Sequence, residues 1–125
     1  MYVKFKSMPK LIALIKKQPH LSAAAFKAYY EKNHAPLVSR LLPMVQRYTR
    51  SYLPASSALP GRGDADFDVI TELWFATTQD VDAFWKRIRS PEVIAQIRAD
   101  EAHFLITERT LMYEVQECES RLLEK

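Results

Sequence analysis

Apolar and polar positions along the chain predict four strands and three helices. The strands are expected at residues 8–16, 44–53, 67–75 and 108–116. The first is a short, nearly continuous apolar run, which is typical of a strand buried on both faces. The second and fourth alternate with a period of two residues, and the third is the strongest strand of the chain because β-branched and aromatic residues fill it.

The three helices are predicted from capping residues and apolar stripes. Ser22 can cap a helix that runs to about His34. Pro36 disfavours helical geometry at the residue before it, so this helix should end there or kink. The other two helices begin after Thr77 or Thr78 and, with proline at the first helical position, at Pro91.

The order strand, helix, strand, strand, helices, strand predicts a ferredoxin-like βαββαβ fold of the α+β class. This fold is an antiparallel sheet with helices on one face, its strands in the order fourth, first, third, second. The strands carry large apolar residues on both alternations, for example Ile70 and Trp74 opposite Val69 and Leu73. Because helices cover only one face, a second copy of the sheet is expected to cover the other in a homodimer.

Composition fits one globular domain over residues 1–125, with a core at about 9–115 and a polar tail at 116–125. Apolar residues make up 48% of the chain and charged residues 26%. The longest apolar run, Leu11 to Ile15, is far below the roughly 20 residues of a membrane helix, and the N-terminus has no signal-peptide pattern. We therefore expect a cytoplasmic protein without a membrane partner. The segment from Pro54 to Ala65 is expected to be a mobile loop, and the single Cys118 excludes an internal disulfide.

Charge is divided unequally between the two halves of the sequence. Residues 1–62 hold 11 Lys and Arg against one acidic residue, whereas residues 63–125 hold 7 against 14. Such asymmetry can indicate nucleic-acid binding, but the predicted fold interleaves strands of the two halves. The third strand also lacks the glycines of an RNA-recognition motif and carries Asp68 and Glu72. No nucleic-acid partner is therefore expected.

Three segments resemble the EthD-type family, a branch of the dimeric α+β barrel proteins. The family pattern Phe-x-x-Tyr-Trp/Tyr followed by His-Ala/Gly-Pro-Leu is similar to residues 26–37. The strand at 72–75 and the segment Ser90-Pro91-Glu92, followed by Asp100-Glu101-x-x-Phe104, also fit the family. The resemblance implies a ferredoxin-like dimer. It also implies cofactor-free chemistry of the lyase, decarboxylase, dehydratase, cyclase or isomerase type.

His34 is the leading candidate for a catalytic residue. It is spaced i, i+4, i+8 with Tyr30 and Phe26, so the three share a helix face that points towards the core. Imidazole moves protons near neutral pH without a cofactor, and the family resemblance implies that this histidine borders a cavity. The alternative is a histidine that satisfies the last carbonyls of a helix. Tyr30 in turn either orients His34 or donates a proton, or is a core side chain.

Glu72 is the other candidate, because an ionised carboxylate within an apolar strand is costly unless it is paired. It forms either a structural ion pair with Arg47 or Arg50, or a cavity carboxylate with a raised pKa. His103 is expected to form an exposed pair beside Asp100. The residues expected to be catalytic are His34, Tyr30 and Glu72; those expected to contact substrate are Tyr29, Tyr48, Arg50, Trp74 and Phe104.

These residues favour a small enzyme that acts without metal, flavin or haem. The chain has two glycines in total, which cannot build a nucleotide-binding loop, and no metal-ligand spacing is present. We expect proton transfer on an apolar aromatic or polyketide-like small molecule. Two alternatives remain open: a non-catalytic small-molecule-binding or stress-associated module of the same fold, and a cofactor-independent monooxygenase.

Overall fold

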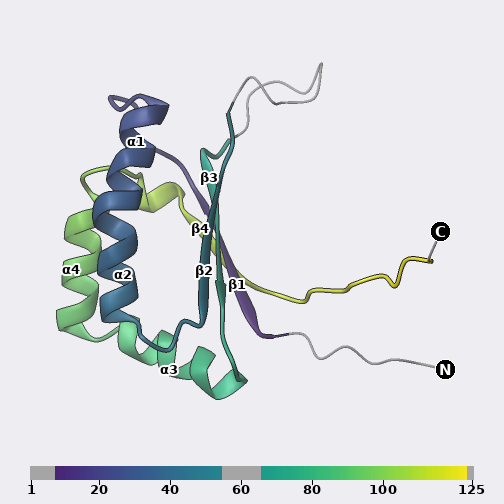
Figure 1. Ribbon diagram of the computed structural model, residues 1–125. Helices are drawn as coiled ribbons and strands as arrows, with labels where there is room; N and C mark the ends of the chain where they lie inside the picture. The colour runs from purple at the N-terminus through teal and green to yellow at the C-terminus, as the bar shows by residue number, and fades with distance from the viewer. Residues whose placement is uncertain (1–7, 55–65, 124–125) are drawn as a thin grey trace.

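The computed structural model describes residues 8–54 and 66–123, which form one antiparallel sheet with helices against one face (Figure 1). The strands are β1 (Lys10–Ile15), β2 (Arg47–Tyr52), β3 (Val69–Trp74) and β4 (Leu111–Val115), in the order β2-β3-β1-β4. This confirms the predicted α+β class, ferredoxin-like strand order and single-sided helical layer. The loop expected from Pro54 to Ala65 lies, apart from Pro54, outside the described residues.

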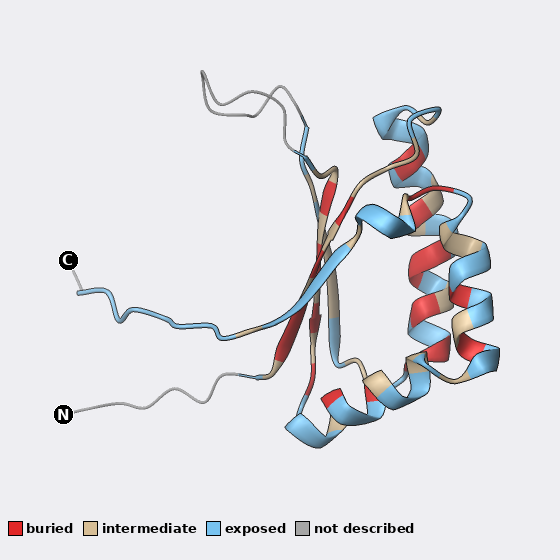
Figure 2. Cartoon of the chain, turned by 180° about the vertical axis from the view of Figure 1, so that it is seen from behind, coloured by how far each residue is buried: buried red, intermediate tan, exposed pale blue. Residues whose placement is uncertain are grey.

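The core lies between the sheet and the helices because the strands alternate. On β1 the side chains of Leu11, Ala13 and Ile15 are buried, and on β3 those of Val69 and Leu73. Residues that are Cα partners in neighbouring strands point to the same face of the sheet. The buried side chains of β1 and β3 therefore form one apolar layer. Figure 2 shows buried residues along the strands and on the helices that lie against the sheet.

The first helical segment is longer than predicted and has three parts. The α-helix α1 (Ala23–Tyr29), capped by the Ser22 hydroxyl, continues as the π-helix η1 (Tyr30–His34) and then as α2 (Ala35–Leu41). Of the two outcomes expected at Pro36, an end or a kink, the end near His34 does not occur, because the chain passes Pro36 by widening one turn rather than by leaving the helix. His34 therefore lies inside a continuous helical segment, and the interpretation as a terminal cap does not hold.

The remaining helices confirm the predicted caps. Helix α3 (Thr78–Ile88) is capped by the Thr77 hydroxyl, which accepts a hydrogen bond from the backbone N–H of Asp80. Helix α4 (Pro91–Glu101) begins with its proline. A short 3₁₀ turn, η3 (Thr107–Arg109), then leads into β4. None of the helices among the described residues is long and apolar enough to cross a membrane.

The other face of the sheet carries no helix (Figures 1 and 2). The strand register places Ile12, Leu14, Ile70, Leu111 and Tyr113 together on it. Leu111 is 42% exposed and Tyr113 53% exposed. The prediction of large apolar residues on both faces thus holds for β1, β3 and β4, but it is wrong for β2, which presents Arg47, Thr49 and Ser51 on this face.

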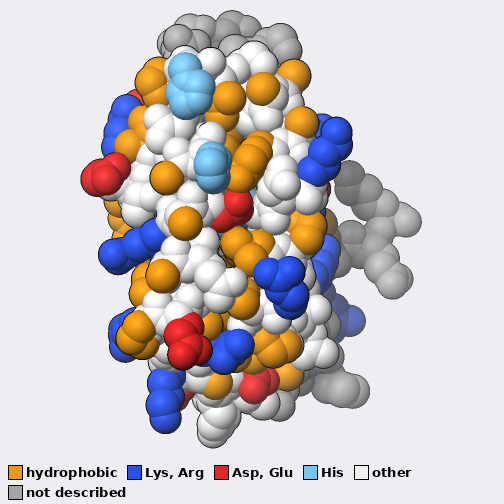
Figure 3. Space-filling model, turned by 90° about the vertical axis from the view of Figure 1, so that its left-hand side faces the viewer, with side chains coloured by type: hydrophobic (Ala, Val, Ile, Leu, Met, Phe, Trp, Pro, Cys, Tyr) orange, Lys and Arg blue, Asp and Glu red, His pale blue; other side chains and the backbone are white. Residues whose placement is uncertain are grey.

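The helix side of the molecule mixes charges of both signs. Figure 3 shows blue and red side chains scattered among orange ones on this side. The helices explain this mixing, because α1, η1 and α2 come from the basic half of the sequence and lie beside α4 from the acidic half.

Candidate active site between the sheet and the helices

A cavity of about 60 Å³ lies between the sheet and the helices. Its polar lining comes from six residues: Tyr30 and His34 on η1, Tyr48 on β2, Thr71 on β3, Glu101 on α4 and Thr110 just before β4. Apolar side chains of the core complete the wall. Met112 on the edge strand β4 is the exposed member of the lining, which places the opening of the cavity at this edge of the sheet.

His34 is held in this cavity by Asp100. The Nδ1 atom of His34 lies 2.8 Å from Oδ2 of Asp100 on helix α4. Tyr29 donates its hydroxyl hydrogen to the other carboxylate oxygen of Asp100 at 2.6 Å. Burial, followed by the bond to Asp100, raises the pKa of Tyr29 to about 12, so this hydroxyl remains a donor.

The pairing leaves His34 with one free basic nitrogen. A carboxylate accepts hydrogen bonds, so Nδ1 carries the hydrogen and Nε2 keeps its lone pair. Burial lowers the pKa of His34 below 6.5, and the bond to Asp100 and its charge oppose this shift. The rings of Phe104 and Tyr30 pack 4.9 Å and 5.4 Å from the imidazole ring. His34 is therefore a neutral, fixed base at the wall of the cavity.

Three hydroxyl groups line the sheet side of the same cavity. Tyr48 donates to the hydroxyl of Tyr30 at 2.9 Å, and the Tyr30 hydroxyl lies 2.6 Å from that of Thr71. Three hydroxyl hydrogens serve only two hydrogen bonds, so one hydrogen, on Tyr30 or Thr71, is left to donate to another acceptor. Burial raises the pKa of Tyr30 and that of Tyr48. These hydroxyls can therefore donate hydrogen bonds without losing their protons near pH 7.

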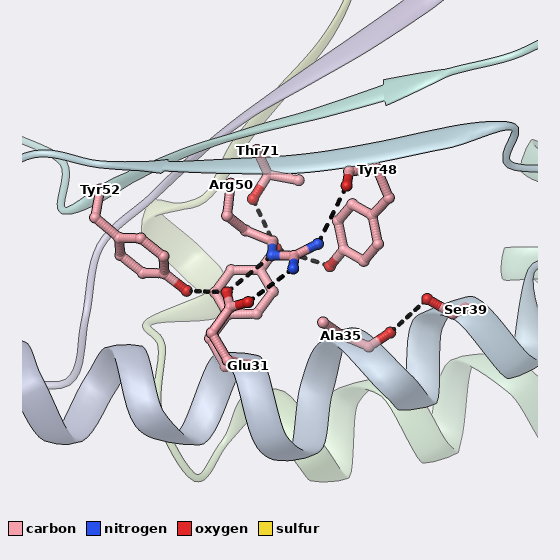
Figure 4. Close-up of polar contacts among 8 residues, drawn as sticks. Glu31, Ala35, Ser39, Tyr48, Arg50, Tyr52 and Thr71 are labelled. Atoms are coloured by element: carbon pink, nitrogen blue, oxygen red, sulfur yellow. Dashed lines mark hydrogen bonds and ion pairs between the residues drawn. The ribbon is translucent and has the colours of Figure 1, made fainter.

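An ion pair beside the cavity ties the sheet to the π-helix. Arg50 on β2 makes two hydrogen bonds to the Glu31 carboxylate, at 2.9 Å and 2.8 Å, and Tyr52 adds a third at 2.6 Å. Figure 4 shows Arg50 and Tyr52 reaching from the strand towards Glu31. These bonds, foremost those from Arg50, lower the pKa of Glu31 to about 2. The guanidinium also lies over the Tyr48 ring. From outside the cavity, Arg50 therefore helps to hold the tyrosine that donates to Tyr30.

Glu101 is the carboxyl group of the cavity. It is the last residue of α4 and follows Asp100, so the two side chains leave the helix about 100° apart. Asp100 reaches His34, whereas Glu101 lines the cavity. Burial raises the pKa of Glu101 to about 7, with Arg98 acting against the shift and Asp100 adding to it. No side-chain hydrogen bond or ion pair holds this carboxyl group within the described part of the chain.

The structure does not bring Glu72 and Trp74 to this cavity. Both lie on the face of β3 away from the helices, opposite in alternation to Thr71 and Leu73. Glu72 accepts a hydrogen bond from Lys10 at 2.9 Å, and the Lys10 ammonium lies 5.0 Å from the Trp74 ring centre. The prediction that they share a cavity with His34 is wrong, because alternation groups side chains without identifying which group faces the helices. The partner of Glu72 is Lys10 rather than Arg47 or Arg50.

The other predicted residues divide between lining and support. Tyr30, His34 and Tyr48 line one cavity, as expected. Tyr29 and Phe104 are absent from the lining: Tyr29 holds Asp100, and Phe104 packs against His34. His103 is exposed, as expected, but its ring lies against Tyr29, while the side chain of Asp100 bonds to His34 instead.

Sequence reasoning missed Asp100, Glu101 and Thr71 as site residues. Asp100 and Glu101 stand in a segment that fits the family pattern, and that was the available signal for them. Thr71 and Glu72 point to opposite faces of β3. A prediction that turned the Thr71 face towards the helices would have included Thr71 in the site. No comparable signal links Asp100 to His34, because 66 positions separate them.

Comparison with known proteins agrees with this fold. The EthD domain model matches residues 18–108. The chain belongs to the EthD domain family. Solved structures similar to this EthD domain include an EthD family protein from Bacillus halodurans, at 23% identity and TM-score 0.63, with 90% of this chain and 100% of that one covered. An EthD-like protein from Ralstonia eutropha is 20% identical, with TM-score 0.61 and coverage of 93% and 98%.

A third similar structure is a dimeric protein of unknown function with a ferredoxin-like fold from Bacteroides fragilis. It is 16% identical, with TM-score 0.51, and the alignment covers 90% of this chain and 100% of that one. At these identities the likeness shows the fold. None of the curated proteins matches the chain.

Proposed function

We propose that this EthD domain is a cofactor-free enzyme that transfers a proton on an apolar, aromatic or polyketide-like small molecule. The observation that carries the proposal is the 2.8 Å contact between His34 and Asp100 at the wall of a cavity. His34 is the base, through Nε2. Asp100 is a positioning residue, since it fixes the tautomer and the orientation of the ring.

The environment of His34 suits this role. A lowered pKa keeps the imidazole neutral at pH 7, which is the form that accepts a proton. When the proton arrives, the adjacent carboxylate of Asp100 stabilises the imidazolium. The free hydroxyl hydrogen of Tyr30 or Thr71 supports the substrate oxygen on which negative charge develops.

The small volume of the cavity restricts what enters it. A space of about 60 Å³ accommodates the reacting group of a compound and not a whole polycyclic molecule, since one water takes roughly 30 Å³. The reacting group enters past Met112, and the remainder of the compound lies towards this opening. An apolar compound fits because core side chains form most of the wall.

The test is proton exchange on 2-tetralone, a bicyclic aromatic ketone, followed by ¹H NMR in D₂O. We expect the wild-type protein to accelerate loss of the proton signal at the carbon between ring and carbonyl. The His34→Ala variant should lose about 10²–10⁴-fold in rate, the usual effect of a general base. Asp100→Asn should lose rate and shift the pH profile, while His103→Ala, on the same side but exposed, should match wild type.

Two other outcomes would identify a different function. Wild-type exchange no faster than that of His34→Ala would contradict the proposal and favour the non-catalytic binding module. Oxygen consumption with an electron-rich phenol, measured with an oxygen electrode and lost in His34→Ala, would favour the monooxygenase alternative, in which the same base ionises the phenol.

We also propose that the protein works as a homodimer joined through the uncovered sheet face. Apolar side chains of β1, β3 and β4 gather there, and Leu111 and Tyr113 are exposed among them. Monomeric proteins rarely leave such a continuous apolar face open. The dimeric description of the Bacteroides fragilis structure supports the same arrangement.

A further inference from the structure

Glu101 and His34 are the carboxyl group and the imidazole of the cavity. They come from different elements, η1 and α4, and both line the same space of about 60 Å³. His34 is held by Asp100, whereas the Glu101 carboxyl group has no side-chain partner within residues 8–54 and 66–123. A carboxyl group beside a cavity and without a partner is available to a bound molecule.

We propose that Glu101 is the proton donor that works with His34, and that the substrate is an enolisable ketone. The inference rests on the proposed function, because it needs His34 as the base. Glu101 donates its proton to the carbonyl oxygen while His34 removes one from the neighbouring carbon. Glu101 is then a catalytic residue, and Asp100 remains a positioning residue.

The step balances in atoms and charge. The C–H bond beside the carbonyl breaks, its proton passes to Nε2 of His34, and its electron pair forms the carbon–carbon double bond. The carbonyl π electrons take the proton of Glu101 to give an enol hydroxyl. The products are the enol, an imidazolium and a carboxylate, so the total charge is unchanged. The reverse step returns a proton to carbon, and in D₂O this proton is a deuteron.

The charges around Glu101 favour its protonated form near pH 7. Burial raises its pKa to about 7; Asp100 adds to this and Arg98 opposes it. The ionisable groups that face the cavity from the other elements are His34 on η1, together with Tyr30 and Tyr48. Neither tyrosine replaces Glu101 as the acid, because burial raises the pKa of both hydroxyl groups. They are therefore weaker acids than the Glu101 carboxyl group.

The experiment compares variants in the 2-tetralone exchange assay across pH 5 to 9. We expect Glu101→Gln to slow exchange by about 10²–10³-fold and to remove the fall in rate that wild type shows above pH 7. Glu92→Gln is the matched control, because Glu92 lies exposed at the start of the same helix. Circular dichroism checks that each variant keeps its fold.

A second measurement reads the hydrogen bond without turnover. With ¹³C at the carbonyl of 2-tetralone, the bound resonance should move downfield below pH 7 in wild type. The shift should vanish in Glu101→Leu, which cannot donate, and remain in Glu92→Gln. A carbonyl resonance that is the same in wild type and Glu101→Leu would overturn the inference.

The outcomes separate the inference from the proposed function. If His34→Ala loses activity while Glu101→Gln keeps the wild-type rate and pH profile, the donor assignment is overturned and the proposed function stands. If wild type and His34→Ala exchange equally slowly, the proposed function is overturned. The inference then falls with it, because Glu101 is proposed to work with His34 as the base, and the ¹³C shift reports only whether Glu101 donates a hydrogen bond to the bound carbonyl.

Discussion

At the scale of single residues, the site depends on burying groups that ionise. His34 is 5% exposed and is kept neutral by burial, while Asp100 accepts hydrogen bonds from both His34 and Tyr29. Glu101 differs because its carboxyl group is drawn towards the protonated form without a side-chain bond. A group placed in this way costs stability when it ionises, and such costs are typical of functional sites.

Because ionising the buried Glu101 lowers the stability of the folded protein, we expect Glu101→Gln to raise the free energy of unfolding at high pH. The unfolded chain releases this proton near pH 4.5, whereas the folded chain holds it until about pH 7. Stability of the wild type therefore falls as pH rises from about 4.5 to 7, because the folded state binds more protons. The variant escapes this fall, so at pH 8 it should be more stable by about 1 to 3 kcal/mol.

Urea denaturation at pH 5 and at pH 8 measures this difference. The two proteins should be nearly equal in stability at pH 5 and diverge at pH 8, with Glu92→Gln following wild type throughout. A difference that does not change with pH would show that Glu101 ionises normally in the folded protein.

The sequence predicted part of the site at this scale. The i, i+4 spacing placed Tyr30 and His34 on one face, and Tyr48, which lines the cavity, was among the residues expected to contact substrate. The sequence pattern pointed to Glu72 instead of Asp100 and Glu101. Period-two alternation separates Glu72 from Thr71 without showing which of the two faces the helices. The contact of His34 with Asp100 depends on packing between helices far apart in the chain, which no local pattern encodes.

At the scale of elements, the π-helix η1 decides where His34 lies. The backbone N–H of Ala35 donates to the carbonyl of Tyr30, five residues earlier. The wider turn absorbs one extra residue, so Phe26 before it and Val38 after it both face the core. It also carries the chain past Pro36, whose ring in a regular helix collides with the carbonyl four residues earlier. π-turns of this kind are frequent at functional sites.

This reasoning predicts that deleting Lys32, an exposed residue of η1, destabilises the fold. The deletion converts the wide turn to a regular one and returns the clash with Pro36, at a cost of about 3 kcal/mol. Adding Pro36→Ala to the deletion should recover most of the loss, because alanine restores an N–H donor and removes the ring. Urea denaturation of the two chains checks this, with Lys32→Ala as the control. A deletion that Pro36→Ala does not rescue would contradict the account.

Local rules predicted the elements well and the transition between them poorly. Ser22, Thr77 and Pro91 correctly marked the beginnings of helices, and the four strands lie within the predicted ranges. The rule for residues before proline predicted an end or a kink at Pro36 and not a widened turn, because it considers only α geometry. The widened turn is stable here because side chains on both sides of it pack against the sheet, and this tertiary contribution is invisible to a local rule.

At the scale of the whole molecule, the two faces of the sheet have different roles. The helix side encloses the cavity, and the open side presents an apolar surface centred on β1 and β4. β4 contributes to both, since Met112 lines the cavity while Leu111 and Tyr113 point the other way. A partner sheet on the open face would therefore hold the strand that forms the mouth of the cavity.

The dimer proposal predicts that charge on β4 separates the subunits. Burying a leucine or tyrosine side chain contributes about 1.5 to 3 kcal/mol, and a two-fold interface uses each position twice. Leu111→Glu with Tyr113→Glu should therefore weaken association by roughly 6 kcal/mol, about 10⁴-fold in Kd. Light scattering should give twice 14.5 kDa for wild type and 14.5 kDa for the variant. Ala95→Glu, exposed on α4, should remain dimeric. A wild-type mass of 14.5 kDa at micromolar concentration would show that the apolar face is left open in the free protein, and that β4 is held by its own chain alone.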